Sequence, residues 1–479
     1  MKRVACAAVV IASAFFNVSW AAAQTVSNPL DVTNSQFAGN EESLGMSPDG
    51  SLLAGAWNDW HFNDGCGFSY STNGGARWAP ESFVPGFTKF TNDPNVPGLN
   101  PKFTVAGDPS VVYNPKFGDF DVVCQAFGTA TGNQIQLLAT TFTPGKVTDP
   151  TDTNGSYGLG AWRLPASVVT TGTSNGSIKG SNGQFPDHES IAVDTHPSSP
   201  YYGRIYVGWA EFNGSGRAPI KVAYSDDNGA TWTGPITVSD SKNQFDQDAR
   251  PSVAPNGDVF MTWINGPNET SLKNNVAMAD VSRTGGASWG TDVTVAPIRG
   301  AYSGLPNSLY RDFSDVWSTT DSSGRLIVAY GDKSTGVPQV WTTHAVHPDS
   351  LAGFAPAFRV DPTNQVQFFP WLSAAPTSGR VDLIFYDRSC DPVSDTLNCV
   401  TESSTSDGGA TWSTVPVTTT GFDGDKFQAC LAFVQSSDCG FYFLGDYIAI
   451  ASTDSEAQML WTGDGPHAQD VFSAHVKFP

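Results

Sequence analysis

The chain has 479 residues, and 46 acidic against 25 basic side chains give it a formal net charge of −21. This charge argues against a nucleic acid or an anionic membrane as partner, because binding to phosphate groups needs clustered Lys and Arg. A hydrophobic content of 39%, including 12% aromatic residues, excludes a disordered acidic chain, and 48 Gly with 32 Pro favour strands and turns over helices.

Residues 1–23 have the three parts of a secretory signal peptide. Lys2 and Arg3 form a positive end, an apolar run occupies 4–16, and small residues fill 21–23 before Gln24. The apolar run is too short to span a bilayer, so we expect no membrane insertion. On this interpretation the protein is secreted or periplasmic, and its mature part is one domain, 24–479.

Six cysteines follow the predicted signal peptide, and an even number in an exported chain indicates disulfides. The sequence alone allows about 15 pairings. A zinc site is disfavoured, because no C-x-x-C pair or group of histidines accompanies these cysteines. The simplest set of disulfides is Cys66–Cys124, Cys390–Cys399 and Cys430–Cys439.

A two-strand segment recurs seven times along the chain. Each copy has a polar approach, an alternating apolar strand, a turn of Pro, Gly, Asn or Asp, and a second strand, as in RPSVAPNGDVFMTWIN. Successive copies start about 60–80 residues apart, which is the size of one blade of a propeller. The copies begin at Glu42, Asp108, Glu189, Arg250, Phe313, Trp371 and Gly445.

Four copies are followed by a turn that ends in Trp. The clearest is SDDNGATW at 225–232, TSDGGATW at 405–412 is close to it, and 71–78 and 282–289 are weaker copies. In such a turn Asp caps backbone N–H groups, Gly adopts a positive φ and Trp packs on the sheet. We therefore assign structural roles to Asp227, Trp232, Asp407 and Trp412.

The Trp-ending turn joins a third strand to a fourth, so each copy supplies four strands. Seven copies predict an all-β fold, a single β-propeller of seven four-stranded blades, with six blades as the alternative. A β-sandwich does not explain the blade-sized period. After Trp461 only the strand 470–477 remains, so we expect an N-terminal strand at 28–34 to close the ring.

The Trp-ending turns resemble the Asp boxes, or BNR repeats, of the sialidase-like propellers, and this resemblance covers most of 24–479. It implies a sialidase-like propeller of the secreted bacterial type, in which the boxes lie away from the active site. Fold alone does not fix function. The family's Phe-Arg-Ile-Pro signature is absent, and 249–252 is only a distant counterpart.

Loops that lead into first strands and follow second strands are expected to meet at one mouth of the channel. They place Arg250, Arg311 and Arg388 on consecutive blades, with Asp187 and His188 beside them. Arginine forks bind carboxylates through two hydrogen bonds, so we expect these five residues to bind an acidic sugar. In the alternative, each arginine pairs with a neighbouring acid in the sequence. These acids are Asp248, Asp312 and Asp387.

The resemblance also implies a tyrosine nucleophile, a glutamate base and an aspartic acid that protonates the leaving oxygen. By position these are Tyr447, then Glu211 or Glu189, and Asp108 or Asp59. The favoured function is therefore an exo-glycosidase that acts on acidic sugar termini of a glycan or polysaccharide.

Two other functions stay open. A polysaccharide lyase would use His61, His188, Tyr447 and Arg250 to remove a proton beside a uronate carboxylate. A non-catalytic glycan- or protein-binding propeller would stack its ligand on Trp60, Trp371 and Tyr302. We expect a monomer without a cofactor. Ca²⁺ stays open at 423–425 and 387–391, although neither matches an EF-hand loop.

Overall fold

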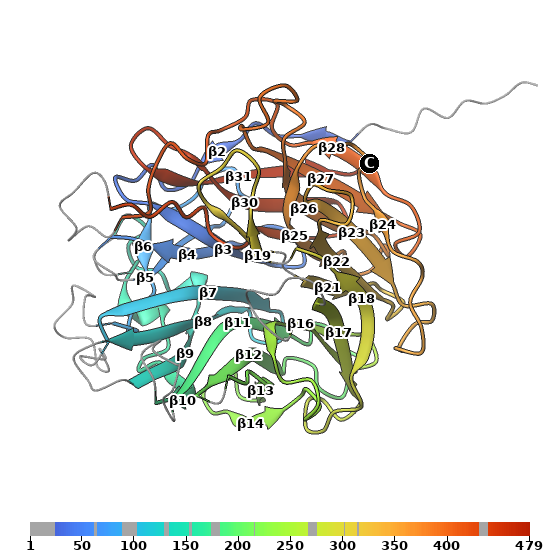
Figure 1. Ribbon diagram of the computed structural model, residues 1–479. Coiled ribbons are helices and arrows are strands. Elements are labelled where there is room, and N and C mark those ends of the chain that lie inside the picture. The colour runs from blue at the N-terminus through green and yellow to red at the C-terminus, as the bar shows by residue number, and fades with distance from the viewer. Residues whose placement is uncertain are drawn as a thin grey trace, which may run out of the picture.

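Seven four-stranded antiparallel sheets form a ring, as the blades of a β-propeller (Figure 1). The structure, a computed structural model, describes residues 24–61, 65–88, 103–128, 134–152, 156–173, 183–214, 216–266, 275–300, 302–313, 316–430 and 439–479. The predicted all-β fold and its seven blades are confirmed. The predicted signal peptide, 1–23, lies outside the described residues.

The strands follow the chain from blade to blade. Blade one has β3 (Gly39–Met46), β4 (Leu53–Asp59), β5 (Gly65–Ser71) and β6 (Ser82–Phe83). Blade two has β7 (Val105–Asn114), β8 (Asp119–Gly128), β9 (Gln134–Phe142) and β10 (Ser167–Gly172), with the short helices η2 (Pro144–Lys146) and η3 (Leu159–Ala161) between its last two strands. Blade three has β11 (Gln184–Val193), β12 (Ile205–Asn213), β13 (Ile220–Ser225) and β14 (Thr233–Thr237).

The second half of the ring has one insertion. Blade four has β15 (Asp246–Val253), β16 (Val259–Asn265), β17 (Asn275–Ser282) and β18 (Val293–Ile298), and the hairpin β19 (Tyr302–Gly304) and β20 (Arg311–Phe313) follows it. Blade five has β21 (Val316–Thr320), β22 (Leu326–Asp332), β23 (Gln339–His344) and β24 (Phe358–Arg359). Blade six has β25 (Gln367–Ala374), β26 (Val381–Asp387), β27 (Cys399–Thr405) and β28 (Ser413–Pro416).

Blade seven joins the two ends of the described chain. Its strands β29 (Ala449–Ser452), β30 (Glu456–Asp464) and β31 (Gln469–Lys477) are completed by β1 (Thr25–Val26) and β2 (Leu30–Asp31), which both pair with β31. The backbone N–H of Val32 also donates to Val471 O at 2.8 Å. The predicted closure of the ring by an N-terminal strand is confirmed, and it covers the edge that β31 would otherwise expose.

The first strand of each blade lies nearest the axis, against the first strands of its neighbours (Figure 1). Serine hydroxyls link some of these strands. The Ser43 hydroxyl accepts the Val111 N–H at 2.9 Å, and the Ser110 hydroxyl accepts the Ile191 N–H at 3.2 Å. The inner ring is therefore held by hydrogen bonds as well as by apolar packing.

A buried tryptophan near the end of the second strand recurs in three blades. Trp57, Trp209 and Trp263 are fully buried. Their indole N–H groups donate to carboxylates, Trp57 to Glu81 at 2.7 Å, Trp209 to Glu211 at 2.7 Å and Trp263 to Asp246 at 3.1 Å. A buried indole needs such an acceptor, so these acids serve the core of their blades.

The four Trp-ending turns connect third to fourth strands, as expected from the sequence. In each, the hydroxyl of the first residue accepts the N–H of the residue four positions later. In the clearest copy the Asp227 carboxylate accepts the Thr231 N–H at 2.8 Å, and Gly229 has a φ of +74°. The local hydrogen bonds explain the repeated residues without a role in binding.

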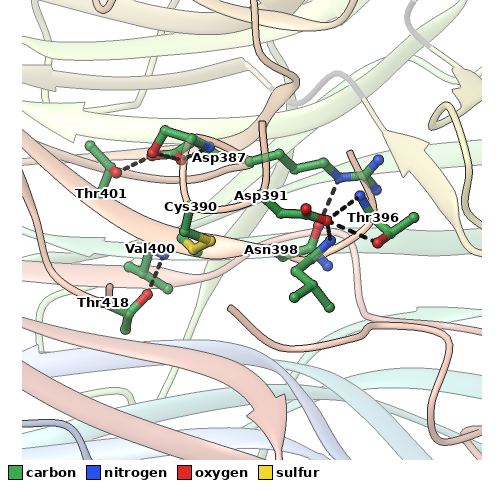
Figure 2. The surroundings of a disulfide bond; sticks show 12 residues. Asp387, Cys390, Asp391, Thr396, Asn398, Val400, Thr401 and Thr418 are labelled. Carbon is green, nitrogen blue, oxygen red and sulfur yellow. Dashed lines mark hydrogen bonds between the residues drawn. A yellow bond between two sulfur atoms is a disulfide. The ribbon is translucent and has the colours of Figure 1, made fainter. Parts of the chain in front are cut away.

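All three predicted disulfides are present. Cys66–Cys124 joins blade one to blade two, and Figure 2 shows the surroundings of Cys390–Cys399 in blade six. Disulfides agree with the oxidising compartment expected for an exported chain. In the described part of the chain, no helix has the length and apolarity needed to cross a membrane.

The closing strand supplies a first test. Val32 is buried with 7% of its surface exposed, whereas Val393 is 93% exposed. We expect Val32→Asp to lower the free energy of unfolding by about 3 kcal/mol, because it buries a charge without a partner. Val393→Asp should change it by less than about 0.5 kcal/mol. Urea unfolding followed by circular dichroism measures both, and equal effects would show that the closing strand contributes no stability.

Candidate functional site

Five first strands contain the same β-bulge at the same place. In β3, β7, β11, β15 and β25 two residues stand opposite one residue of the second strand. The first of the two has a positive φ although it is not glycine, which is uncommon and marks functional sites more often than other places. These residues are Glu41 (+60°), Asp108 (+52°), His188 (+52°), Asp248 (+61°) and Phe369 (+53°).

The bulges of blades one and two bring two carboxyl groups together. Asp108 hydrogen-bonds Glu41. Asn58 of β4 supports both, since its side-chain N–H donates to Glu41 and its Oδ1 accepts the Asp108 N–H at 2.8 Å. Burial, with the nearby charges of Asp108 and Asp446, raises the pKa of Glu41 well above its ordinary value. Burial followed by the charge of Asp187 raises the pKa of Asp108 to about 6. The pair therefore retains a proton near neutral pH.

His188 lies among carboxylates from several blades. Its Nδ1 is 3.3 Å from Asp248 Oδ1 and its Nε2 is 3.9 Å from Asp187 Oδ2. Burial alone would lower the pKa of His188, but Asp187, Asp248, Asp108 and Asp446 outweigh it and raise the pKa to about 9. The ring is thus an imidazolium at neutral pH and supplies positive charge rather than a base.

Tyr447 lies at the centre of an aromatic and cationic group. The Arg250 guanidinium is 4.3 Å from the Trp317 ring centre and 5.5 Å from that of Tyr447. Trp371 stacks on Trp317 at 3.4 Å and is itself only 8% exposed, so it is not the exposed platform that the sequence suggested. Burial, then the charges of Glu41 and Asp108, raises the pKa of Tyr447 well above its ordinary value. Its hydroxyl is a phenol at neutral pH.

Arg311 reaches the same group from the inserted hairpin. Its Nε donates to Asp446 Oδ1 at 2.8 Å, and its Nη2 donates to Asp446 Oδ2. Asp446 precedes Tyr447 in the loop before β29. The Arg311 side chain is 57% exposed, while Arg250 is 3% exposed. Two of the three predicted arginines therefore converge on Tyr447 and its neighbours.

Arg388, predicted as the third substrate-binding arginine, has a different place. It is fully buried, and all five of its N–H donors are used. The acceptors are Asn398 Oδ1, Pro306 O, Asp395 O, Ser308 Oγ and Tyr310 Oη. No donor is left for a substrate carboxylate. Arg388 instead fastens the segment between β19 and β20 to blade six.

Glu211, predicted as the catalytic base, also has a different place. Its Oε2 accepts the Trp209 indole N–H at 2.7 Å, as Glu81 and Asp246 do for the equivalent tryptophans. The acids whose charges act on Tyr447 are Glu41, Asp108 and Glu189. Glu189 was the alternative base, and burial followed by the charge of Asp108 raises its pKa well above the ordinary value.

Three site residues received no catalytic or substrate-binding role from the sequence: Glu41, Asp248 and Asp446. All three lie in the polar approach to a first strand, which places them at the mouth of the channel. No role could be read there for Glu41 and Asp248, because the β-bulges that position them depend on pairing with the second strand.

Among the residues that the structure describes, no group of three or more His, Cys, Asp or Glu is arranged to hold a metal ion. The acids of the loop 387–391, where Ca²⁺ stayed open, bind their own backbone instead (Figure 2). Asp391 Oδ2 accepts the N–H groups of Thr396 and Leu397, both at 3.1 Å, and Asp387 Oδ1 accepts the Ser389 N–H at 2.7 Å. These carboxylates order the loop that carries the Cys390–Cys399 disulfide.

Comparisons with known proteins give structural likeness only. No family model and no curated protein matches the chain. A protein of unknown function from Dyadobacter fermentans is similar with a TM-score of 0.47 and 13% identity over 83% of this chain and 100% of that one. A mutant NanB sialidase from Streptococcus pneumoniae is similar with a TM-score of 0.41 and 12% identity, over 76% of this chain and 67% of that one. An ulvan lyase is similar with a TM-score of 0.45 and 12% identity, over 95% of this chain and 94% of that one. Likeness at this level does not identify an activity.

The buried arginine supplies a second test. We expect Arg388→Ala to lower the free energy of unfolding by more than about 3 kcal/mol, because it leaves several buried acceptors unpaired. Arg283 is the control, since it donates to Asp349 O at 2.8 Å but its side chain is 56% exposed. Arg283→Ala should cost less than about 1 kcal/mol. Similar losses in chemical unfolding would contradict the structural role of Arg388.

His188 supplies a third test. Its folded-state pKa of about 9 lies above the ordinary value of 6.5, so its charge stabilises the fold fully below pH 6.5. This contribution, about 3 kcal/mol, disappears as the pH rises through about 9. Stability measured between these pH values should therefore fall more steeply in the wild type than in His188→Asn. His347→Asn, at an exposed position, should keep the wild-type slope, and a wild-type slope in His188→Asn would contradict the assignment.

Proposed function

We propose that this propeller is an exported glycoside hydrolase, with its reaction centre at the mouth where blades one, two and seven meet. The observation that carries the proposal is the hydrogen-bonded pair Glu41 and Asp108, which keeps a proton near neutral pH beside the phenol of Tyr447. Glycoside hydrolysis needs one protonated and one ionised carboxyl group near the same bond. Near neutral pH the Glu41 carboxyl keeps its proton while Asp108, with a pKa of about 6, is largely ionised, and the pair meets this need.

In the proposed reaction Glu41 donates its proton to the glycosidic oxygen as the bond to the anomeric carbon breaks. The Tyr447 oxygen bonds to that carbon, and the phenol proton passes to the ionised Asp108. A water molecule then displaces Tyr447, giving one proton to Glu41 while Tyr447 recovers its own from Asp108. All three residues return to their starting states, so the cycle is balanced.

An acidic terminal sugar is the proposed substrate class. Arg250 and Arg311 supply guanidinium groups beside Tyr447, and His188 adds a third positive charge. A substrate carboxylate would bind the exposed side of the Arg311 guanidinium, while the buried Asp446 keeps its bond to the same group. A lyase reaction with His188 as base is disfavoured, because an imidazolium has no lone pair to accept the proton.

The experiment measures hydrolysis of 4-methylumbelliferyl glycosides of sialic acid, glucuronic acid, arabinofuranose and glucose. We expect turnover of an acidic glycoside, with kcat lowered at least about 100-fold in Glu41→Gln, Asp108→Asn and Tyr447→Phe. Asp226→Asn is the matched control, because Asp226 is 62% exposed in an outer turn. Thermal unfolding checks that each variant folds.

The pH profile adds a prediction specific to Asp108. Since its pKa is about 6, the wild-type kcat/KM should fall as the pH drops below about 6 and this base gains a proton. Asp108→Asn should lose this ascending limb. If the wild type binds glycans but hydrolyses none of the four substrates, the binding-propeller alternative replaces the hydrolase.

A further inference from the structure

We infer that Trp60, Phe441 and Phe443 form a subsite that stacks one sugar ring of an extended glycan beside the reaction centre. This inference rests on the proposed function for its place in a reaction, although binding itself can be tested without turnover. The three residues are called the aromatic platform below.

The aromatic platform combines a buried base with an exposed face. Phe443 is 7% exposed and packs with Ala38 and Ala429. Phe441 stacks on it, with ring centres 5.3 Å apart and an interplanar angle of 26°, and is 46% exposed. Trp60 leans on both rings at 5.7 and 6.0 Å. A ring held in this way offers its face to a ligand with little loss of side-chain freedom.

Direct contacts join the aromatic platform to the reaction centre. The Arg311 guanidinium lies 5.1 Å from the Phe443 ring centre and binds Asp446, which precedes Tyr447. The Trp60 indole N–H donates to Asn40 Oδ1 at 3.1 Å, and Asn40 precedes Glu41. The platform therefore adjoins the two loops that carry Tyr447 and Glu41, which is where a neighbouring sugar of the substrate would lie.

The chemistry around the aromatic platform suits a sugar. The C–H face of a pyranose packs on an aromatic face, and its hydroxyl groups need polar partners at the edges. Such a partner is present in Arg311, whose guanidinium lies over Phe443 and whose side chain is 57% exposed. The fully buried Asn40 holds the platform from beneath, because its amide donates to Phe443 O at 3.3 Å. A purely apolar partner would cover the exposed Arg311 guanidinium and remove its water without offering it an acceptor.

A matched control is available at the same end of the ring. Phe245 precedes β15 and is 45% exposed, against 46% for Phe441. Both are phenylalanines of equal exposure, but Phe441 stacks on Phe443 and adjoins Arg311 through it. Replacing each by alanine removes the same side chain, so a difference between them reports the platform rather than general hydrophobicity.

The test titrates the full chain with 3′-sialyllactose, chitohexaose and hexagalacturonate, using saturation-transfer NMR and tryptophan fluorescence. We expect at least one probe to bind and Phe441→Ala to weaken it about tenfold, with Phe245→Ala within about twofold of the wild type. Trp60→Ala should weaken the same probe, and thermal unfolding checks its fold. Binding to none of the probes, or equal effects of Phe441→Ala and Phe245→Ala, would overturn the subsite.

The outcomes separate this inference from the proposed function. If no aryl glycoside is hydrolysed but probe binding depends on Phe441, the hydrolase proposal fails and the subsite stands. If aryl glycosides are hydrolysed and Phe441→Ala leaves probe binding unchanged, the hydrolase stands and the subsite fails. Where both hold, Phe441→Ala should raise KM for the oligosaccharide about tenfold, and Phe245→Ala should leave that KM within about twofold of the wild type.

Discussion

The candidate site depends on one backbone constraint: the first residue of the β-bulge in the first strand has a left-handed conformation, with a positive φ. Such a residue costs about 1 kcal/mol or more when it is not glycine, so the surrounding structure must hold it. In three blades the single residue opposite the bulge is a buried tryptophan: Trp57, Trp209 or Trp263. The same packing that fills the blade thus supports a strained backbone that carries polar side chains to the mouth.

The second consequence of the bulges is electrostatic. Carboxyl groups from several blades are buried close together, and water cannot separate their charges. Each relieves this repulsion differently. Asp446 binds Arg311, Asp248 lies 3.3 Å from the His188 imidazolium, and Glu41 and Asp108 have pKa values raised by burial and by neighbouring charges. Near neutral pH the mouth therefore holds protonated carboxyl groups, ionised carboxylates and cations close together. This combination is suited to acid–base chemistry.

The fold was predictable because its causes are local. The turn at 225–232, the strand periodicity and the two disulfides that span nine residues each depend on residues close in sequence. The candidate site was predictable only as a set of loops. Glu211 accepts the indole N–H of Trp209, which lies two residues earlier on the same face of the strand. The sequence shows the spacing of these two residues but not this hydrogen bond, so it did not distinguish a structural carboxylate from a catalytic one. Arg388 was misassigned because its acceptors at Pro306 and Ser308 lie 82 and 80 residues away in the sequence, so the sequence alone did not show that they use its donors.

The positions of Arg388 and Arg311 also explain each other. Arg388 binds Pro306, Ser308 and Tyr310, which lie in the segment that leads directly to Arg311. One guanidinium is fully buried with every donor used, so it fixes the backbone. The other is 57% exposed, so it can bind a substrate on its exposed side while the buried Asp446, 1% exposed, keeps its partner. These two arginines therefore have unlike roles. Burial, which the sequence repeat does not encode, separates the residue that positions from the residue that binds.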